Sequence, residues 1–340
     1  MSSRSADNLC VLGIETSCDD TAAAVLRGRD LLASVISSQH DIHGPYGGVV
    51  PELASRQHMV NILPVIDRAL ATARVSLDDV QGVAVTFTPG LIGSLLVGLS
   101  TAKGIAAARG IPLVGVNHLE GHLLAVLLGG GAEVAFPFLA LLVSGGHSCL
   151  YLVEDLGAYR YLGGTRDDAA GEAFDKVANM MGLGYPGGPA IDAVARRGDG
   201  RAVRFPRARL KQGSYDLSFS GLKTAVRVFL QANPGWKEQV EDVAASFQDA
   251  VVDMLLAPTL RAARDLGIKR LVLTGGVSAN SRLRDRAAAE CRETGLAVFS
   301  PPPELCTDNA AMIAFAGAWR LERGQRSLLS LRAVAAGLRP

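Results

Sequence analysis

Two histidines four residues apart, His118 and His122 in the segment NHLEGH, are the residues whose types and spacing most directly suggest chemistry. On a helix, residues at this spacing lie one above the other on the same face, so both imidazoles can bind one metal ion. Two ligands make only half of a stable site. The third must come from elsewhere, and the distant segment Cys306-Thr-Asp308 offers a thiol and an acid. The alternative is a surface helix with two incidental histidines.

Zinc proteases use the same histidine spacing, but they place the catalytic glutamate directly after the first histidine. In this sequence Leu119 follows His118, and the acid is Glu120. Glu120 lies roughly 200° around a helix from His118, since each residue turns about 100°. Its carboxylate therefore cannot reach a water held by both rings. The spacing predicts a metal half-site without the protease mechanism.

Asp308 has a second local role available to it. It stands just before an alanine-rich segment that we expect to form the closing helix, where an aspartate can cap the first turn. The cap and ligand roles would compete, because a metal-bound carboxylate has fewer lone pairs left for backbone amides.

The elements around these residues indicate an α/β protein with an internal duplication. Each half begins with a buried strand, a turn of small polar residues and a return strand. These segments are residues 9–14, 15–21 and 22–26 in the first half, and residues 138–143, 144–148 and 149–153 in the second half. The recurrence predicts two related lobes built to hold a phosphate or an adenylate between them. A plain polar hairpin is the alternative for the first turn.

Glycine-rich junctions in the second half are typical of ligand contacts. The paired glycines of Ser144-Gly-Gly-His-Ser148 allow a ligand to approach the backbone closely. Residues 182–189 contain six glycines or prolines in eight positions, with Asp175 and Asp192 on either side. A strand, two glycines and a helix start meet near Asn280. The junction near Asn280 has neither the dinucleotide motif GxGxxG nor the P-loop motif GxxxxGK[ST].

Composition excludes several classes of protein. The 340 residues suffice for two lobes, and a formal net charge of +1 gives no global signal for nucleic acid or anionic membranes. Five scattered cysteines without a CxxC pair favour a reducing compartment. The first residues lack the apolar core of a signal peptide, so we expect a cytoplasmic protein. The one concentrated basic run, residues 201–211, is either a solvated loop or an RNA-backbone contact.

A series of long motifs, all in one order between about residues 11 and 318, resembles the bacterial TsaD family of tRNA-modifying enzymes. The motifs are GIETSCDDT, VPELASRQH, NHLEGH, LLVSGGHS, GEAFDK, YPGGPAID, FSGLKTAV, LTGGVSAN and CTDNAAMIA. The resemblance implies an α/β fold of two duplicated lobes in the actin-like ATPase superfamily, which includes sugar kinases and heat-shock chaperones. We expect the first lobe over residues 8–117, completed by a C-terminal helix at 308–330, and the second over residues 118–307.

The resemblance also assigns roles to residues of this sequence. The metal ligands would be His118, His122 and Asp308, holding one divalent ion, Fe²⁺ with Zn²⁺ as the alternative. Glu15 is a candidate for a different reason, its position at the first turn, which suits either a general base or an indirect role in support of a ligand. The expected contacts with the substrate threonylcarbamoyl-adenylate (threonylcarbamoyl-AMP) are Leu142, Val143, Ser144, Gly145, Gly146, Asp175, Gly188, Asp192 and Asn280.

The reaction implied by the resemblance is transfer of the threonylcarbamoyl group to N6 of the adenosine adjacent to the anticodon, in tRNAs that read codons beginning with A. AMP would be released. The implied partners are tRNA, a TsaB-like paralogous subunit, a TsaE-like small P-loop ATPase and a TsaC-like enzyme that supplies the adenylate, with no membrane involved. We expect the paralogue to contact the helix that begins at Pro51.

Three other functions remain open from the residues alone. One is a nucleotide-dependent carbamoyl or phosphoryl transferase acting on a small molecule, which would turn over without tRNA. Another is a metallopeptidase, which the position of Glu120 disfavours. The third is a non-enzymatic scaffold, which would leave the metal constellation unused.

Overall fold

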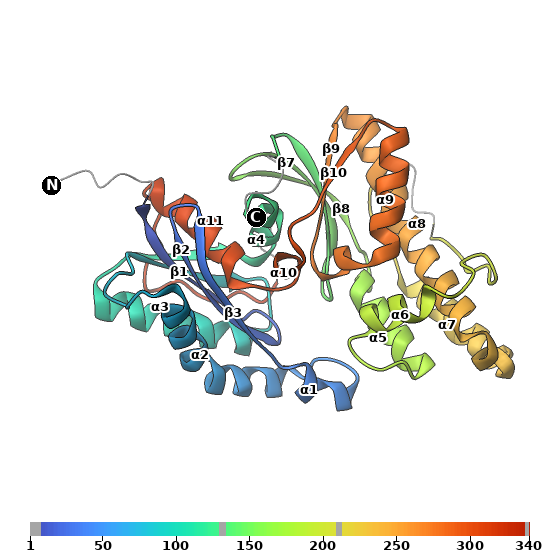
Figure 1. Ribbon diagram of the computed structural model, residues 1–340, viewed down its shortest axis with the longest axis horizontal. Coiled ribbons are helices and arrows are strands. Elements are labelled where there is room, and N and C mark those ends of the chain that lie inside the picture. Colours follow the sequence, from blue (N-terminus) through green and yellow to red (C-terminus); the bar gives the residue numbers. More distant parts are fainter. Residues whose placement is uncertain (1–7, 129–133, 209–212, 337–339) are drawn as a thin grey trace. The chain divides into compact units, whose positions relative to one another are not determined.

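A computed structural model describes residues 8–128, 134–208, 213–336 and 340 of the chain (Figure 1). The chain divides into two compact units. Unit 1 comprises Met1–Glu133 and Pro301–Pro340, and unit 2 comprises Val134–Ser300. Each unit contains a five-stranded sheet flanked by helices, which confirms the α/β class. The expected boundary at residue 118 differs from the one observed, because the helix α4 (His118–Leu124) packs against α11 (Ala310–Glu322) inside unit 1.

The sheet of unit 1 is mixed, with the strand order β3-β2-β1-β4-β5. Its strands are β1 (Cys10–Glu15), β2 (Asp20–Arg27), β3 (Asp30–Ser38), β4 (Gly82–Thr88) and β5 (Leu113–Asn117). The first three strands pair antiparallel, whereas β1, β4 and β5 run parallel. Because carboxyl ends of parallel strands meet at one edge of a sheet, Glu15, Thr88 and Asn117 end up near one another.

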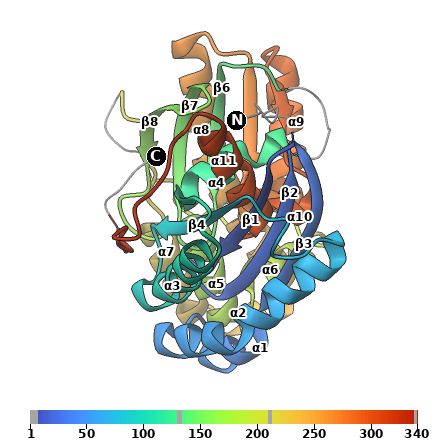
Figure 2. The same ribbon diagram turned by 90° about the vertical axis from the view of Figure 1, so that its left-hand side faces the viewer.

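Helices cover both faces of this sheet. Figures 1 and 2 show α11 on one face, with α2 (Pro51–Ala73) and α3 (Ile92–Arg109) on the other face. The shorter helices of unit 1 are α1 (His40–His43), η2 (Gly44–Tyr46), η3 (Ala125–Leu127) and α10 (Pro303–Cys306). The apolar core between the sheet and the α2–α3 pair includes Leu12, Ile14, Ile66, Val85 and Leu99, each of which is buried.

Glycine lets α11 approach the sheet closely. A Cβ atom at Gly13 in β1 would lie 2.8 Å from the Cβ of Ala314 and would also overlap the carbonyl oxygen of Ala310. A Cβ at Gly317 on α11 would overlap Ala84 in β4. Side chains at these positions would push the helix away from the strands, together with the loop that precedes it.

Unit 2 repeats the topology of unit 1. Its strands are β6 (Phe138–Val143), β7 (Ser148–Asp155), β8 (Ala158–Gly164), β9 (Arg270–Thr274) and β10 (Ala297–Phe299). The order is β10-β9-β6-β7-β8, with β6, β7 and β8 antiparallel and β6, β9 and β10 parallel. The strand β6 therefore occupies the place of β1, which confirms the duplicated lobes predicted from the sequence.

The helices of unit 2 surround one large core. They are α5 (Ala170–Met181), α6 (Gly187–Ala195), α7 (Ser220–Ala232), η4 (Pro234–Gln239), α8 (Val240–Leu266), η5 (Gly276–Ala279) and α9 (Ser281–Glu293). The segment Pro234–Leu266 is long and apolar enough to cross a membrane, but 78% of its most apolar window is buried inside the fold. We therefore interpret α8 as a core helix, which packs against α6 and places its Phe247 ring edge-on to Phe174.

The close approach of α11 to β1 predicts a stability difference between two glycine substitutions. Gly13→Ala should lower the free energy of unfolding by about 1–3 kcal/mol, because the new methyl group overlaps α11. Gly104→Ala is the control: it lies in α3 with nothing within 4 Å of its added Cβ, and it should be neutral or stabilising. Urea unfolding of both variants measures the difference, and equal stabilities would contradict the close packing.

Candidate functional site

The carboxyl edge of the unit 1 sheet positions the two histidines. The strand β5 ends at Asn117, whose side-chain Oδ1 accepts a hydrogen bond from the backbone N–H of Leu119 at 2.9 Å. This cap begins α4 immediately after the strand. His118 and His122 are both buried, and the spacing of four residues places them on one face of α4 as expected.

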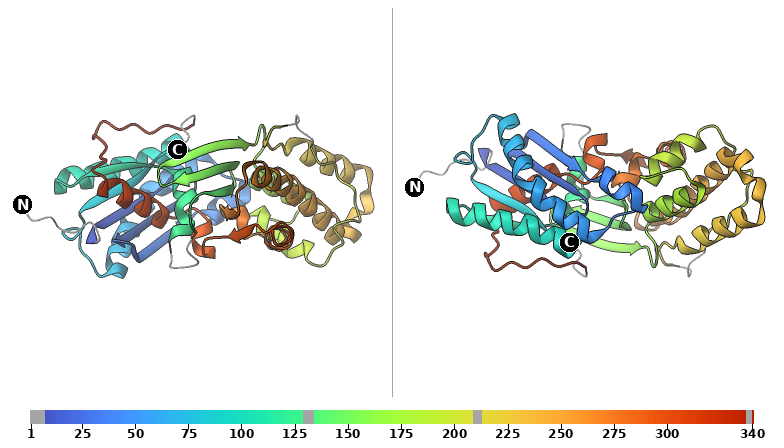
Figure 3. Two further views of the ribbon diagram at one scale, coloured as in Figure 1. Left: turned by 90° about the horizontal axis from the view of Figure 1, so that it is seen from above. Right: turned by 90° about the horizontal axis from the view of Figure 1, so that it is seen from below.

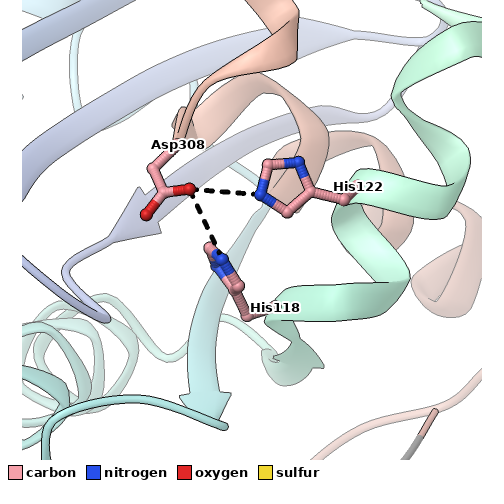
Figure 4. A group of neighbouring side chains, drawn as sticks. All are labelled: His118, His122 and Asp308. Carbon is pink, nitrogen blue, oxygen red and sulfur yellow. Dashed lines mark hydrogen bonds and ion pairs between the residues drawn. The ribbon is translucent and has the colours of Figure 1, made fainter. Parts of the chain in front are cut away.

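Asp308 joins the histidines from a distant part of the chain (Figure 4). Its Oδ1 lies 3.1 Å from Nε2 of His122 and 3.5 Å from Nε2 of His118. One ligand atom from each residue falls within 4.8 Å of the others, so the three can converge on one ion. The structure thus brings together the three residues that the resemblance implies as metal ligands.

Asp308 does not cap the closing helix, contrary to the competing role considered from the sequence. The cap is Asn309, whose Oδ1 accepts the backbone N–H of Met312 at 3.0 Å. The side-chain nitrogen Nδ2 of Asn309 also donates to the carbonyl oxygen of Thr307 at 2.8 Å and so fixes the preceding loop. Capping and ligation therefore use adjacent residues and do not compete.

Glu15 supports His118 from the end of β1. Its side chain is fully buried, and Oε2 lies 2.9 Å from Nδ1 of His118. Thr86 donates its hydroxyl to the same oxygen at 2.6 Å, and the backbone N–H of Ser17 donates to Oε1 at 2.5 Å. A carboxylate bonded to Nδ1 fixes the tautomer and ring orientation of a histidine, which directs Nε2 toward Asp308.

Sequence reasoning missed Thr86 and Ser17 as parts of this arrangement. Ser17 places its hydroxyl 3.2 Å from Nδ1 of His118, and Thr86 comes from β4, which lies parallel to β1. The signal that could have found Thr86 is its position near the carboxyl end of an apolar segment, residues 83–87, that is typical of a buried strand.

Negative charge accumulates around these ligands. Burial lowers the pKa of His118, but Asp308 and Glu15 outweigh it and raise that pKa to about 9. Burial lowers the pKa of His122. Burial and then the charges of Asp308 and Asp19 raise the pKa of Asp20 to about 7.

These features fit a divalent cation. Within the described residues, Oδ2 of Asp19 and Oδ1 of Asp20 are buried without a hydrogen-bond partner. Two imidazole nitrogens and one carboxylate oxygen form a donor set that suits Fe²⁺ or Zn²⁺. A bound cation would offset the repulsion among the carboxylates, which otherwise costs free energy in a buried site.

Glu120, which lies between the two histidines in the sequence, is bonded to α11. It is fully buried and accepts a hydrogen bond from Nη2 of Arg320 at 2.8 Å. A peptidase would need this carboxylate beside a metal-held water. The structure agrees with the sequence argument against that mechanism.

In unit 2, the expected substrate contacts Leu142 through Gly146 form the end of β6 and the turn after it. The turn is closed by the N–H of Ser144, which donates to the carbonyl of His147 at 2.7 Å, and by the N–H of His147, which donates to Oγ of Ser144 at 3.1 Å. Leu142 and Val143 are buried, whereas Gly145 and Gly146 are exposed with open space around them. The glycines therefore leave the backbone accessible to a ligand.

Two other segments hold this turn in place. The first amides of α5 donate to it, from Gly171 to the carbonyl of Ser144 and from Glu172 to that of Gly145, both at 3.2 Å. Gly275, which follows β9, lies so close to Val143 that a Cβ would overlap the carbonyl oxygen there, and its φ is +87°. Only glycine meets both requirements without strain.

The remaining expected contacts stabilise the same part of unit 2. Oδ1 of Asp175 accepts the N–H of Gly187 at 2.7 Å, which holds the start of α6, and Gly188 follows with open space around it. Oδ1 of Asp192 accepts the hydroxyl of Ser281 at 2.7 Å. Asn280, directly before Ser281, caps α9 through the N–H of Leu283. Asp192 and Asn280 are thus brought together, although they lie far apart in the sequence.

A cavity of about 390 Å³ in unit 2 is lined in part by residues that hydrogen-bond to Asp192 and Asn280. Two of its lining residues connect it to them, because Ser281 bonds to Asp192 and Gln248 accepts the amide N–H of Asn280 at 2.8 Å. Its rim also carries Arg282, which forms two hydrogen bonds with Asp249. Sequence reasoning did not single out Gln248 or Arg282, because neither lies in a glycine-rich motif.

The basic run of residues 201–211 is only partly described. Arg201 and Arg204 are exposed, whereas Arg207 forms an ion pair with Asp253 at 2.9 Å. Arg209 and Lys211 lie outside the described residues. The pairing of Arg207 reduces the positive charge that the run offers to an RNA backbone.

Solved structures with a similar fold include a HypF and a hexokinase. HypF from T. kodakarensis aligns with a TM-score of 0.62 at 14% identity, over 93% of this chain and 48% of that one. A ROK hexokinase from Thermus thermophilus aligns with a TM-score of 0.51 at 16% identity, over 93% of this chain and 100% of that one. Both likenesses show the fold alone, and they agree with the two-lobed α/β architecture expected from the sequence.

Sequence comparison gives the family. Residues 30–315 match the family model of TsaD, described as tRNA N6-adenosine threonylcarbamoyltransferase. A protein of that name from Geobacter metallireducens is 55% identical over 329 residues, which are 96% of each chain. Another, from Anaeromyxobacter dehalogenans (strain 2CP-1), is 57% identical over 323 residues, 93% of this chain and 96% of that one. Matched along most of its length by the family model and by these relatives, the chain belongs to the TsaD family of transferases.

Proposed function

We propose that this enzyme transfers the threonylcarbamoyl group of threonylcarbamoyl-adenylate to N6 of the adenosine next to the anticodon, in tRNAs that read codons beginning with A. The observation that carries the proposal is the convergence of His118, His122 and Asp308 in a chain of the TsaD family. A kinase or a scaffold of the same fold would have no use for this buried ligand set.

The chemistry is an acyl transfer from a mixed anhydride. The N6 amine attacks the carbamoyl carbon, the bond from that carbon to the phosphate oxygen breaks, and AMP leaves with the electron pair while N6 loses a proton. A divalent metal, Fe²⁺ in our proposal and Zn²⁺ as the alternative, would anchor the threonylcarbamoyl group and polarise its carbonyl as a Lewis acid.

The residues of unit 1 prepare the ligands for this role. Glu15 would accept a hydrogen bond from Nδ1–H of His118 and so hold the proton on that nitrogen. The lone pair of Nε2 would then be available to bind the metal. Thr86 and Ser17 hold Glu15 in place. We infer that Glu15 acts by positioning His118 and not as the general base, because hydrogen bonds from three groups already engage its two oxygens in a fully buried position.

The residues of unit 2 would hold the adenylate. The exposed backbone at Gly145 and Gly146 suits the phosphate, as small polar turns commonly bind anions. Asp175 and Asp192 retain acceptor capacity for ribose hydroxyls, because a carboxylate has about four lone-pair sites. Asn280 lies beside Asp192 and would contact the same nucleoside.

We also propose the partners and setting implied by the family. An exposed apolar surface on α2 and α3, which lie side by side in Figure 3, supports contact with a TsaB-like paralogous subunit. Its exposed residues are Met59, Val60, Leu63, Ile92 and Leu96. A TsaE-like ATPase, a TsaC-like source of adenylate and tRNA complete the proposed cytoplasmic system.

The transfer itself is tested by nucleoside mass spectrometry. Unmodified tRNA that decodes a codon beginning with A is incubated with this protein, its proposed partners and threonylcarbamoyl-adenylate. We expect threonylcarbamoyladenosine to form and to be lost when this chain alone is omitted. Active partners without product, or turnover of the adenylate onto small acceptors in the absence of tRNA, would contradict the proposal.

Removing one histidine tests the metal ligands. His118→Ala should reduce bound metal from about one ion per chain to near zero, because two of the three donors cannot hold the ion tightly. His40→Ala is the control, since His40 is an exposed histidine on α1. Elemental analysis after dialysis measures the metal content. Full retention by His118→Ala would remove His118 from the ligand set.

Asp20 predicts a pH dependence of stability in the metal-free protein. Its pKa rises from the ordinary 3.8 to about 7 on folding, so the folded state holds the proton more tightly than the unfolded state. Stability should therefore fall as pH rises from about 4 through about 7, and Asp20→Asn should remove this loss. The melting temperature of Asp20→Asn, relative to that of wild type, should therefore increase as the pH rises across this window.

Asp41→Asn serves as the control for that experiment, because Asp41 is exposed and its replacement removes the same charge. Its melting temperature should follow wild type at every pH. A constant difference between Asp20→Asn and wild type from pH 4 to 8 would show that Asp20 ionises normally.

A further inference from the structure

Glu120 is a buried acid that the proposed chemistry does not use. All of its side chain is removed from solvent, although it lies between two metal-ligand candidates on α4. Its carboxylate is held by Arg320, the side chain of which is 30% exposed. The pair therefore joins α4 to the last turn of α11 within unit 1.

Stability alone is a poor explanation for such a pair. Removing a carboxylate from water costs several kcal/mol, and hydrophobic residues of similar size often stabilise a protein equally well in its place. The better-attested use of a buried ion pair is to specify one arrangement of the elements that carry it. The question is which arrangement this pair specifies.

The two helices that the pair connects are the helices that position the metal ligands. The helix α4 carries His118 and His122. Asp308 directly precedes Asn309, which caps α11 and bonds to the first turn of that helix, so Asp308 moves with α11. A slide or rotation of α11 against α4 would change the distance from Asp308 to both imidazoles.

Contacts at both ends of α11 define its place on α4. Near the first turn, Gly121 lies against Met312 and Ile313, and a Cβ there would come within 2.9 Å of each side chain. Near the last turn, Nη2 of Arg320 lies 2.8 Å from Oε2 of Glu120. The first contact limits how closely the helices approach, and the second sets their register along and around the axis.

We propose that Glu120 and Arg320 are positioning residues of the metal centre, which set the register of α11 on α4 and hence the distance of Asp308 from His118 and His122. The inference rests on the proposed metal site. It assigns to Glu120 a role distinct from that of the protease glutamate, because it acts through the helices and touches neither substrate nor ion.

The test measures metal affinity in the full-length protein. Glu120→Gln, Arg320→Gln, Arg320→Lys and the double variant Glu120→Gln/Arg320→Gln are titrated with Zn²⁺ against a chelator, at a temperature where each is folded. We expect the two single variants with glutamine to bind at least about 10-fold more weakly than wild type, as for other residues that orient metal ligands. Arg320→Lys keeps a positive charge that can reach Glu120. It should therefore bind Zn²⁺ more tightly than Arg320→Gln does.

Arg323→Gln is the matched control. Arg323 follows the last residue of α11, lies over the Trp319 ring at 4.3 Å from its centroid and carries the same charge as Arg320. Its replacement should leave the affinity within about twofold of wild type. A second readout is the visible spectrum of the Co²⁺-loaded protein, which should change in the variants with glutamine at position 120 or 320 because the ligand geometry changes.

The outcomes separate a positioning role from a structural one. Folded single variants that bind Zn²⁺ within about twofold of wild type, even with a lower melting temperature, would overturn the inference. Where a single variant does not fold, the double variant decides by the same threshold. It removes both charges of the pair, and a glutamine at position 320 is too short to replace the contact that the arginine makes with position 120. Wild-type protein that binds no divalent ion would instead overturn the metal centre itself.

Discussion

The packing of α11 across the sheet of unit 1 is the constraint on which the proposed metal centre depends. The strand β1 presents Gly13 to this helix, and α11 presents Gly317 to β4, so helix and sheet approach more closely than side chains would allow. That approach brings the loop with Asp308 to the carboxyl edge of the sheet, where His118 and His122 begin the next helix. Two proposed ligands that lie 186 positions apart in the sequence, His122 and Asp308, are thereby brought together.

Charge at this edge is arranged around His118. Glu15 on one side and Asp308 on the other raise the pKa of the imidazole, while Asp19 and Asp20 add further carboxylates close by. A buried group of acids is unfavourable without a cation to balance it. The same arrangement that destabilises the metal-free protein therefore favours the binding of a divalent ion.

The two units show how one topology can serve two kinds of ligand. The turns after β1 and β6 occupy equivalent places in the two sheets, at the carboxyl end of the central strand. In unit 1 the strand ends in Glu15, whose carboxylate contacts His118, a proposed metal ligand. In unit 2 the turn contains Gly145 and Gly146, whose missing side chains leave the backbone open to a substrate. The two units share one sheet topology, and the residues at the end of the central strand differ between them.

The sequence by itself determined the first two strands of each unit, the duplicated organisation and the histidine pair, because hydrophobic periodicity and residue spacing are local properties. It did not reveal β3, the place of α4 in unit 1, or Asn309 as the cap in place of Asp308. Only the tertiary structure brought Thr86 to Glu15 and Arg320 to Glu120. Those contacts join residues 71 and 200 positions apart, and their geometry depends on how whole elements pack, which no local pattern encodes.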